Sequence, residues 1–136
     1  MTGKIKRAHA SDIMNHNVAT VKESETLENA AKIMAEKKIG SVIVVDISNE
    51  PKGIITESDL IRIIAKRGKD FFNLDAGAVM SKPLVTIIPS MDIEKVEKEM
   101  KRRNVKHLPV FASGELHGMI TSKDIVDYLG KWKLSE

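Results

Sequence analysis

Apolar positions along this 136-residue chain fall into two patterns, short continuous runs and stretches of helical spacing. Residues 41–45 form an almost wholly apolar, β-branched run, which predicts a strand buried on both faces of a sheet. Before that run, Leu27, Ala30 and Met34 recur at helical spacing and predict one apolar stripe on a helix. Ser24 is the expected cap of this helix, because a serine side chain can accept a hydrogen bond from a first-turn amide.

The pattern continues through the rest of the chain. A short strand is expected at residues 18–21, and another at 53–55 after a polar turn. Thr56 is the expected cap of the next helix, which should end near Arg67 with Gly68 as its stop. The second half is expected to hold a strand at 84–87, a helix at 91–103, strands at 108–111 and 119–120, and a helix from 121 to about 133.

One stretch of the chain occurs twice. Residues 53–59 read glycine, two apolar residues, threonine, two variable polar residues and aspartate, and residues 118–124 read the same. Upstream apolar positions match at a constant offset, for example Met14 with Met80. One loop is a residue shorter in the second copy, which moves its closing motif by one position. Self-similarity of this kind indicates two copies of one supersecondary unit.

Each copy is expected to have the order β-α-β-β-α. The fold class is therefore α/β (α+β), with two tandem repeats packed with pseudo-two-fold symmetry. We expect repeat one at residues 12–67, a linker at 68–77 and repeat two at 78–130. Phe71 and Phe72 predict that the linker packs against the domain. Because a unit of about 60 residues buries only about 60% of its unfolded surface, the two halves are expected to share one core.

The composition narrows the class of protein. The absence of cysteine removes disulfides and thiolate metal sites, and it fits a reducing compartment. No apolar run approaches the roughly 20 residues of a membrane span, so a cytoplasmic protein with no membrane partner is expected. Residues 1–11 are polar and basic, without the apolar core of a secretory signal, and are expected to be loosely held. The net charge of +3 selects no partner by itself.

No arrangement of residues indicates catalysis or a metal site. The chain has no defensible Ser-His-Asp order, no His-Glu-x-x-His and no Gly-Lys-Ser/Thr phosphate loop, so no catalytic residue is predicted. The histidines lack metal-ligand spacing, and only His107 is a candidate for contact with a phosphate. We therefore expect a protein that is not an enzyme, with no metal and no cofactor.

The repeated motif is similar to that of the CBS domain, named after cystathionine β-synthase, and two tandem copies resemble a Bateman module. Residues 105–110 resemble the second recurrent segment of the family, apolar-x-x-apolar-Pro-Val, whereas the first copy has Ile43 where Pro109 stands. The resemblance covers residues 12 to 130. It implies a stand-alone, homodimeric regulatory module that binds AMP, ADP or ATP, sometimes NAD or S-adenosylmethionine, and acts on an unidentified partner protein. AMP and ATP are the ligands expected first.

The resemblance also assigns residues to two clefts between the repeats. The first cleft is expected to hold Thr56, Asp59, Leu84, Val85, Val105, Lys106 and His107. The second is expected to hold Val18, Ala19, Ile39, Gly40, Ser41, Thr121 and Asp124. In these roles the aspartate accepts hydrogen bonds from both ribose hydroxyls. The threonine leaves helix-start amides to a phosphate, and the motif glycine lets the strand approach the ligand.

The two clefts are not expected to be equivalent. Lys106 and His107 stand at the mouth of the first cleft, and Gly40 and Ser41 at the corresponding place in the second. We therefore hypothesise that the first cleft binds phosphate more tightly.

Several alternatives stay open at this point. Thr-x-x-Asp is also the pattern of a capping box, in which the two side chains satisfy amides at a helix start. The basic stretch 98–103 is either a solvated helix face or a nucleic-acid surface, although aromatic residues are absent from it. The pair could also be a purely structural dimerisation module. Trp132 and Leu134 lie beyond the repeat and either pack back on the domain or anchor a dimer.

Overall fold

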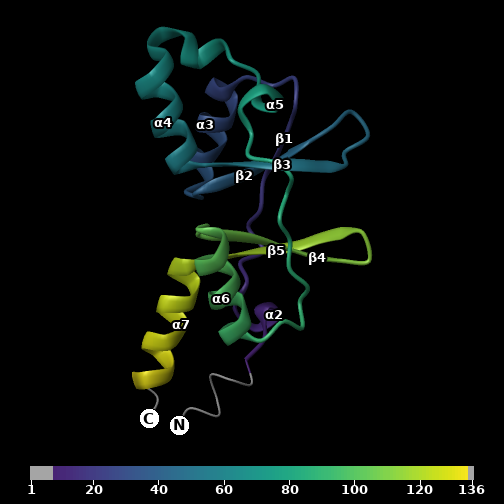
Figure 1. The fold of residues 1–136 in the computed structure, drawn as a ribbon, viewed down its shortest axis with the longest axis vertical. Helices are drawn as coiled ribbons and strands as arrows, with labels where there is room; N and C mark the ends of the chain where they lie inside the picture. Colours follow the sequence, from purple (N-terminus) through teal and green to yellow (C-terminus); the bar gives the residue numbers. More distant parts are fainter. Residues whose placement is uncertain (1–7, 135–136) are drawn as a thin grey trace. The chain divides into compact units, whose positions relative to one another are not determined.

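The computed structural model describes residues 8–134, and Figure 1 shows how its elements follow one another. Helices and strands occur in both halves, which confirms the predicted mixed α/β (α+β) class. In chain order, the elements are α2 (Ala10–Ile13), β1 (Thr20–Lys22), α3 (Leu27–Lys37), β2 (Ser41–Val45), β3 (Pro51–Thr56), α4 (Glu57–Arg67), the 3-10 helix η1 (Gly68–Asn73), α5 (Ala76–Val79), α6 (Ile93–Arg103), β4 (His107–Ala112), β5 (Glu115–Thr121) and α7 (Ser122–Leu134). The side chains of Trp132 and Leu134 lie outside the described part, as do residues 1–7.

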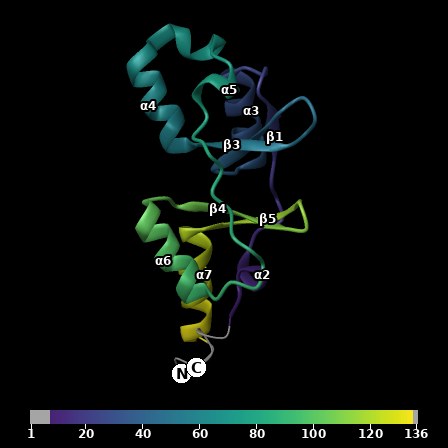
Figure 2. The same cartoon turned by 45° about the vertical axis from the view of Figure 1, so that its right-hand side comes forward.

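The chain divides into two compact units, and each buries a core of its own. The continuous unit is the stretch 17–84, with α3, α4 and α5 around β1, β2 and β3 (Figure 2). The split unit joins the segment up to His16 to the chain from Val85 onward, and it contains α2, α6, α7, β4 and β5. Each unit therefore has an apolar core of its own, and the expectation that the two halves share one core stays a prediction.

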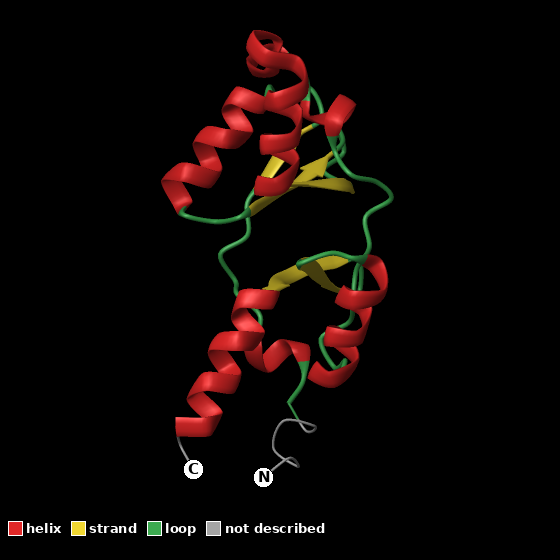
Figure 3. Cartoon of the chain, turned by 60° about the vertical axis from the view of Figure 1, so that its left-hand side comes forward, coloured by secondary structure: helices red, strands yellow, loops and turns green. Residues whose placement is uncertain are grey.

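In the continuous unit, helices cover one face of a three-stranded sheet (Figure 3). β2 lies in the middle, parallel to β1 and antiparallel to β3. All five residues of β2 are buried, as the apolar run predicts. Leu27, Ala30 and Met34 of α3 pack in the same core. These contacts confirm the predicted strand and apolar helix stripe.

The ends of α3 differ from the sequence-based expectation. Its cap is Thr26 rather than Ser24, because Thr26 Oγ1 accepts a hydrogen bond from the Asn29 amide at 3.2 Å. At the other end the chain turns at Lys38, whose φ of 55° is left-handed. The helix therefore ends at Lys37, and Gly40 lies just beyond the turn.

The ends of α4 agree with the expectation. Thr56 caps the helix, Arg67 is its last residue, and Gly68 follows with a φ of 57°, a conformation that favours glycine. The linker packs as predicted, since Phe71 is only 4% exposed and belongs to the core of the continuous unit. Phe72 lies edge-on to Phe71 and stays half exposed.

In the split unit, β4 and β5 form an antiparallel pair, but the strand expected at 84–87 is wrong. The structure has only a parallel bridge from Ile87 to Val110 in its place. In the first copy, β1 pairs with β2 over three residues that include Ile43. Pro109 stands at the position equivalent to Ile43 and has no amide hydrogen to donate, so the ladder is shorter.

A short segment from elsewhere in the sequence closes each core. In the continuous unit this segment is α5, and in the split unit it is α2; Ala76 and Ala10 are each 0% exposed. Residues 12–16, which the sequence division assigns to the first repeat, therefore pack in the split unit, where Ile13 and Met14 contact the core. The boundaries of the sequence repeats stay a prediction. The compact units differ from these repeats, because residues 12–16 of the first repeat pack in the split unit and residues 78–84 of the second repeat pack in the continuous unit.

The same packing orders residues 8–11, so the expectation of a loose segment is wrong for them. The amides of Ala10 and Ser11 donate to the carbonyls of Met91 and Pro89 at 2.8 and 2.9 Å. Two backbone hydrogen bonds and a fully buried alanine hold this segment on the split unit.

The two motif glycines serve packing within each unit. A Cβ on Gly53 would lie 2.6 Å from the Ser81 carbonyl oxygen and 2.8 Å from Met80 Sδ. A Cβ on Gly118 would lie 2.9 Å from the Asn15 carbonyl oxygen and equally close to the sulfur of Met14. Because glycine has no Cβ, residues 80–81 can cross close over β3 at Gly53, and residues 14–15 can cross close over β5 at Gly118. The expected role of the glycine, which is to let a ligand approach, stays a prediction beside this packing role.

Candidate functional site

Both Thr-x-x-Asp motifs form capping boxes at helix starts. At α4, the Asp59 amide donates to Thr56 Oγ1 at 3.3 Å and the Thr56 amide donates to Asp59 Oδ2 at 2.9 Å. At α7, Asp124 and Thr121 exchange the same two bonds at 3.1 and 2.9 Å. The capping alternative is confirmed, and any ligand role comes in addition to it.

Both oxygens of the Asp59 carboxylate have partners within the continuous unit. The residue is only 9% exposed, and its Oδ2 also accepts from the Thr56 hydroxyl at 3.0 Å. Arg62 Nη2 donates to the other oxygen, Oδ1, at 2.7 Å. A nearly buried carboxylate needs such partners, because an unpaired charge is costly away from water. Sequence reasoning missed Arg62, although its spacing of three residues from Asp59 on one helix was a usable signal.

The surroundings of Asp124 differ. Asp127 occupies the position that corresponds to Arg62, and Lys123 Nζ pairs with Asp127 Oδ2 at 3.0 Å. The hydrogen bond to Asp127 is the main reason why the pKa of Lys123 is raised. Among the described residues, no cationic side chain lies within ion-pair distance of the Asp124 carboxylate. The two motifs therefore share their backbone geometry and differ in local charge.

In the continuous unit, further predicted residues lie beside the motif at α4. Ser41 is 6% exposed and pairs in register with Thr56. The Gly40 carbonyl accepts a hydrogen bond from the Glu57 amide at 3.1 Å. Ala19 is buried in the same core, and Val18, Ile39 and Leu84 are partly buried.

In the split unit, the second recurrent segment lies beside the motif at α7. His107 pairs in register with Thr121, and the Lys106 carbonyl accepts from the Ser122 amide at 3.0 Å. Val85 and Val105 pack against the core of this unit. The assignment from the family resemblance instead combines each motif with residues of the other unit, and those combinations stay predictions.

Two of the helix-start amides at each motif already have partners within the protein. The first amide of each helix donates to a carbonyl of the neighbouring segment, and the third donates to the motif threonine. A phosphate at either motif would therefore depend more on charged side chains than on these amides.

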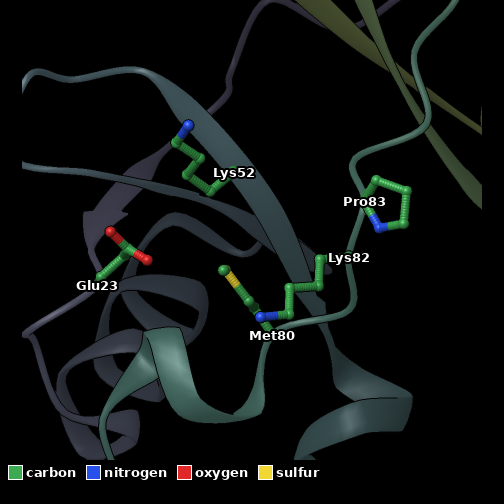
Figure 4. Close-up of a pocket in the computed structure, with 5 residues that line it drawn as sticks. All are labelled: Glu23, Lys52, Met80, Lys82 and Pro83. Carbon is green, nitrogen blue, oxygen red and sulfur yellow. The ribbon is translucent and has the colours of Figure 1, made fainter.

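A separate hollow of about 560 Å³ lies in the continuous unit (Figure 4). Its lining residues are Glu23, Lys52, Met80, Lys82 and Pro83. None of the predicted cleft residues lines it, and the five residues show no common spacing in the sequence. The hollow is lined by two ammonium groups, and that of Lys52 is already paired with the Asp46 carboxylate at 3.7 Å.

Glutamates pair with four of the five basic residues of α6, and the helix keeps an excess of two positive charges. Glu94 and Glu97 pair with the lysines four residues on, at 3.8 and 3.4 Å. Arg102 and Arg103 both contact Glu99, at 2.9 and 3.2 Å, and their hydrogen bonds lower the pKa of Glu99 to about 2. Such a helix presents paired charges to solvent rather than a row of free cations for phosphates.

The part of the chain that the structure describes has neither a metal-binding cluster nor a membrane-spanning helix. No three histidine, aspartate or glutamate side chains gather there in a way that could hold a metal ion. No helix among residues 8–134 combines the length and apolarity needed to cross a membrane.

Comparison with known proteins gives matches over both repeats. The model of the CBS domain family matches twice, at residues 10–66 and 76–131. An uncharacterized protein of Methanopyrus kandleri is 32% identical over 90% of this chain and 63% of its own length. The homoserine O-acetyltransferase of Methanohalobium evestigatum is 33% identical over 89% of this chain but only 24% of its own length. The chain thus spans between a quarter and two thirds of these relatives.

Solved structures agree in fold. The CBS-domain containing protein ATU1752 from Agrobacterium tumefaciens has a TM-score of 0.83 and 27% identity, covering 89% of this chain and 92% of its own. The CBS domain pair of protein MJ0100, solved in complex with 5′-methylthioadenosine and S-adenosyl-L-methionine, has a TM-score of 0.81 and 23% identity. That match covers 91% of this chain and 97% of the other.

Proposed function

The chain belongs to the CBS domain family, and from that premise we propose that it is a non-catalytic regulatory module that binds adenosine-containing ligands and signals to a partner protein. The observation that carries the proposal is the matched pair of motifs, each with a partly buried aspartate fixed at a helix start. The ligands named for the pair of protein MJ0100 belong to the same chemical class. A cytoplasmic location is part of the proposal and rests on the absence of cysteine.

The chemistry of the motif fits a ribose. A carboxylate has about four acceptor sites, and a charged acceptor bonds about twice as strongly as a neutral one. Asp124 accepts one capping bond and has room for both ribose hydroxyls, whereas Asp59 already accepts three hydrogen bonds and has room for one hydroxyl. Because the capping bonds hold Asp59 and Asp124 in place, little side-chain freedom is lost when a ligand binds. Regulation then requires that the ligand bind one state of the protein more tightly than another.

The long relatives support a regulatory role over a catalytic one. The homoserine O-acetyltransferase match covers about a quarter of that protein, so the shared part is one region of a larger enzyme. We propose that the region has a regulatory task there as well. The nucleic-acid alternative is disfavoured by the paired charges on α6.

The test is a thermal melt of the protein against AMP, ADP, ATP, NAD and S-adenosylmethionine. A ligand at about 100 times its dissociation constant adds about 2.7 kcal/mol of stability, which raises Tm by about 5–10 °C. Asp59→Asn and Asp124→Asn keep the size of the side chain and an oxygen for the capping bond but remove the charge. We expect one or both to lose the rise in Tm.

Thr26→Ala is the matched control, since it removes a helix cap in the continuous unit away from both motifs. It should lower Tm without changing the rise on ligand binding. No rise with any compound, for protein purified free of bound nucleotide, would contradict the proposal. Binding to nucleic acid that weakens steeply with salt would then favour the basic-face alternative.

We further propose that two copies of the chain associate through α4 and α7. Ile61 and Val126 occupy equivalent positions on these helices and are 69% and 65% exposed. A contiguous exposed apolar patch marks an interface, and the proposal requires Ile61 and Val126 to belong to one such patch. The double variant Ile61→Lys, Val126→Lys should be monomeric in sedimentation experiments, whereas Ile47→Lys, at a 90% exposed loop position, should assemble like the parent. An unchanged assembly of the double variant would exclude this interface.

A further inference from the structure

The helix residue three positions after the motif aspartate carries opposite charges in the two copies. It is Arg62 in the continuous unit and Asp127 in the split unit. Both side chains are more than half exposed, at 62% and 55%, so a bound ligand can reach either. The two capping boxes otherwise match, so replacing the cation Arg62 by the anion Asp127 changes the formal charge at this position by two.

In the continuous unit, the guanidinium lies directly on the motif carboxylate. Arg62 Nη2 is 2.7 Å from Asp59 Oδ1, so a ribose on this carboxylate would lie next to the cation. A guanidinium has five N–H donors in a fixed fork, and the bond to Asp59 uses one of them. The remaining donors suit the oxygens of a phosphate attached to that ribose.

In the split unit, the adjacent cation Lys123 interacts with Asp124 only at longer range, and its direct contact is with another carboxylate. Lys123 pairs with Asp127 at 3.0 Å, and the two carboxylates of Asp124 and Asp127 lie one helical turn apart. A phosphate dianion beside Asp124 would meet the second carboxylate within the screening length of about 8 Å at physiological salt. The first and third amides of α7 are already bonded and offer it no compensation.

We propose that Arg62 and Asp127 give the two motifs different ligands, a phosphate-bearing adenosine compound at Asp59 and an uncharged or cationic adenosine compound at Asp124. The inference rests on the proposed function and adds the ligand class of each motif. It names Arg62 and Asp127 as the residues that determine specificity. Neither is part of the Thr-x-x-Asp pattern.

The experiment is calorimetric titration of the full chain with AMP and, separately, with 5′-methylthioadenosine. The parent protein should bind AMP at one site per chain. Arg62→Gln should weaken AMP on the order of 10-fold, the worth of one charge-assisted hydrogen bond, and change binding of 5′-methylthioadenosine less than about 3-fold. Asp127→Arg should create a second AMP site. Arg62→Lys should restore part of the loss.

Salt provides a second readout. AMP affinity of the parent should fall with ionic strength more steeply than that of Arg62→Gln, because the lost contact is between charges. Arg67→Gln, in the last turn of the same helix, is the control that should match the parent.

Three results would overturn the inference. If Arg62→Gln weakens both compounds equally, Arg62 only positions Asp59. If Asp127→Arg gains no AMP site, charge does not select the ligand there. If Lys106→Gln lowers the affinity for AMP and Arg62→Gln does not, the phosphate contact lies in the second recurrent segment. Absence of binding by the parent protein to either compound would instead reject the proposed function, and this inference with it.

Discussion

Gly53→Ala is expected to lower the free energy of unfolding by about 2–3 kcal/mol, and Gly118→Ala by somewhat less. The added methyl group would lie 2.6 Å from the Ser81 carbonyl oxygen in the first case and 2.9 Å from the Asn15 carbonyl oxygen in the second. Met80 and Met14 can shift, but a hydrogen-bonded backbone cannot do so without loss. Urea denaturation of each variant measures the difference.

Gly130→Ala is the control for this pair. Gly130 lies in α7, and a Cβ there would meet no heavy atom within 4 Å. Alanine is the better helix former by up to about 1 kcal/mol, so this variant should be at least as stable as the parent. If Gly53→Ala were equally well tolerated, the close crossing over β3 would not exist as described.

The second large effect is expected from Ala10→Asp and Ala76→Asp, which each place a carboxylate in a core at a position with 0% exposure. A buried, unpaired charge is among the few changes that cost more than about 4 kcal/mol. The two variants should unfold different units. Ala10→Asp should abolish hydrogen-exchange protection in β4, β5 and α6, and Ala76→Asp should do so in β1, β2 and β3.

Ala78→Asp is the matched control, because Ala78 lies on the exposed side of α5 and should tolerate the charge. The outcome for Ala10→Asp separates two descriptions of the chain. If protection were lost in β1 to β3, α2 would belong to the continuous unit. The division into units described above would then be wrong.

Local features of the fold were predictable from the sequence because neighbouring residues determine them. The buried run of β2 and the Thr56 cap each depend on a few adjacent side chains. The choice of Thr26 over Ser24 as a cap was not predictable, since both are good cap residues two positions apart. The shortened pairing at Ile87 was open to prediction, because the missing donor of Pro109 is visible in the sequence.

Features that depend on tertiary packing could not be predicted. The repeat predicts that residues 12–16 resemble 78–82, and it carries no information on which core each segment joins. For the candidate site, the sequence located the two motifs. The pairing of Arg62 with Asp59, and of Lys123 with Asp127, needed side-chain positions.

The division into a continuous and a split unit also sets an order of events during synthesis. Residues 17–84 can fold as soon as they have left the ribosome, whereas α2 is made first and finds its core only after β4, β5 and α6 exist. At about 5–20 residues per second, the apolar side chains of Ile13 and Met14 wait for several seconds without a partner. Nascent chains should therefore present residues 10–16 to chaperones, and a chain that stalls once residue 84 has left the ribosome should carry a folded continuous unit next to an unpacked α2 segment.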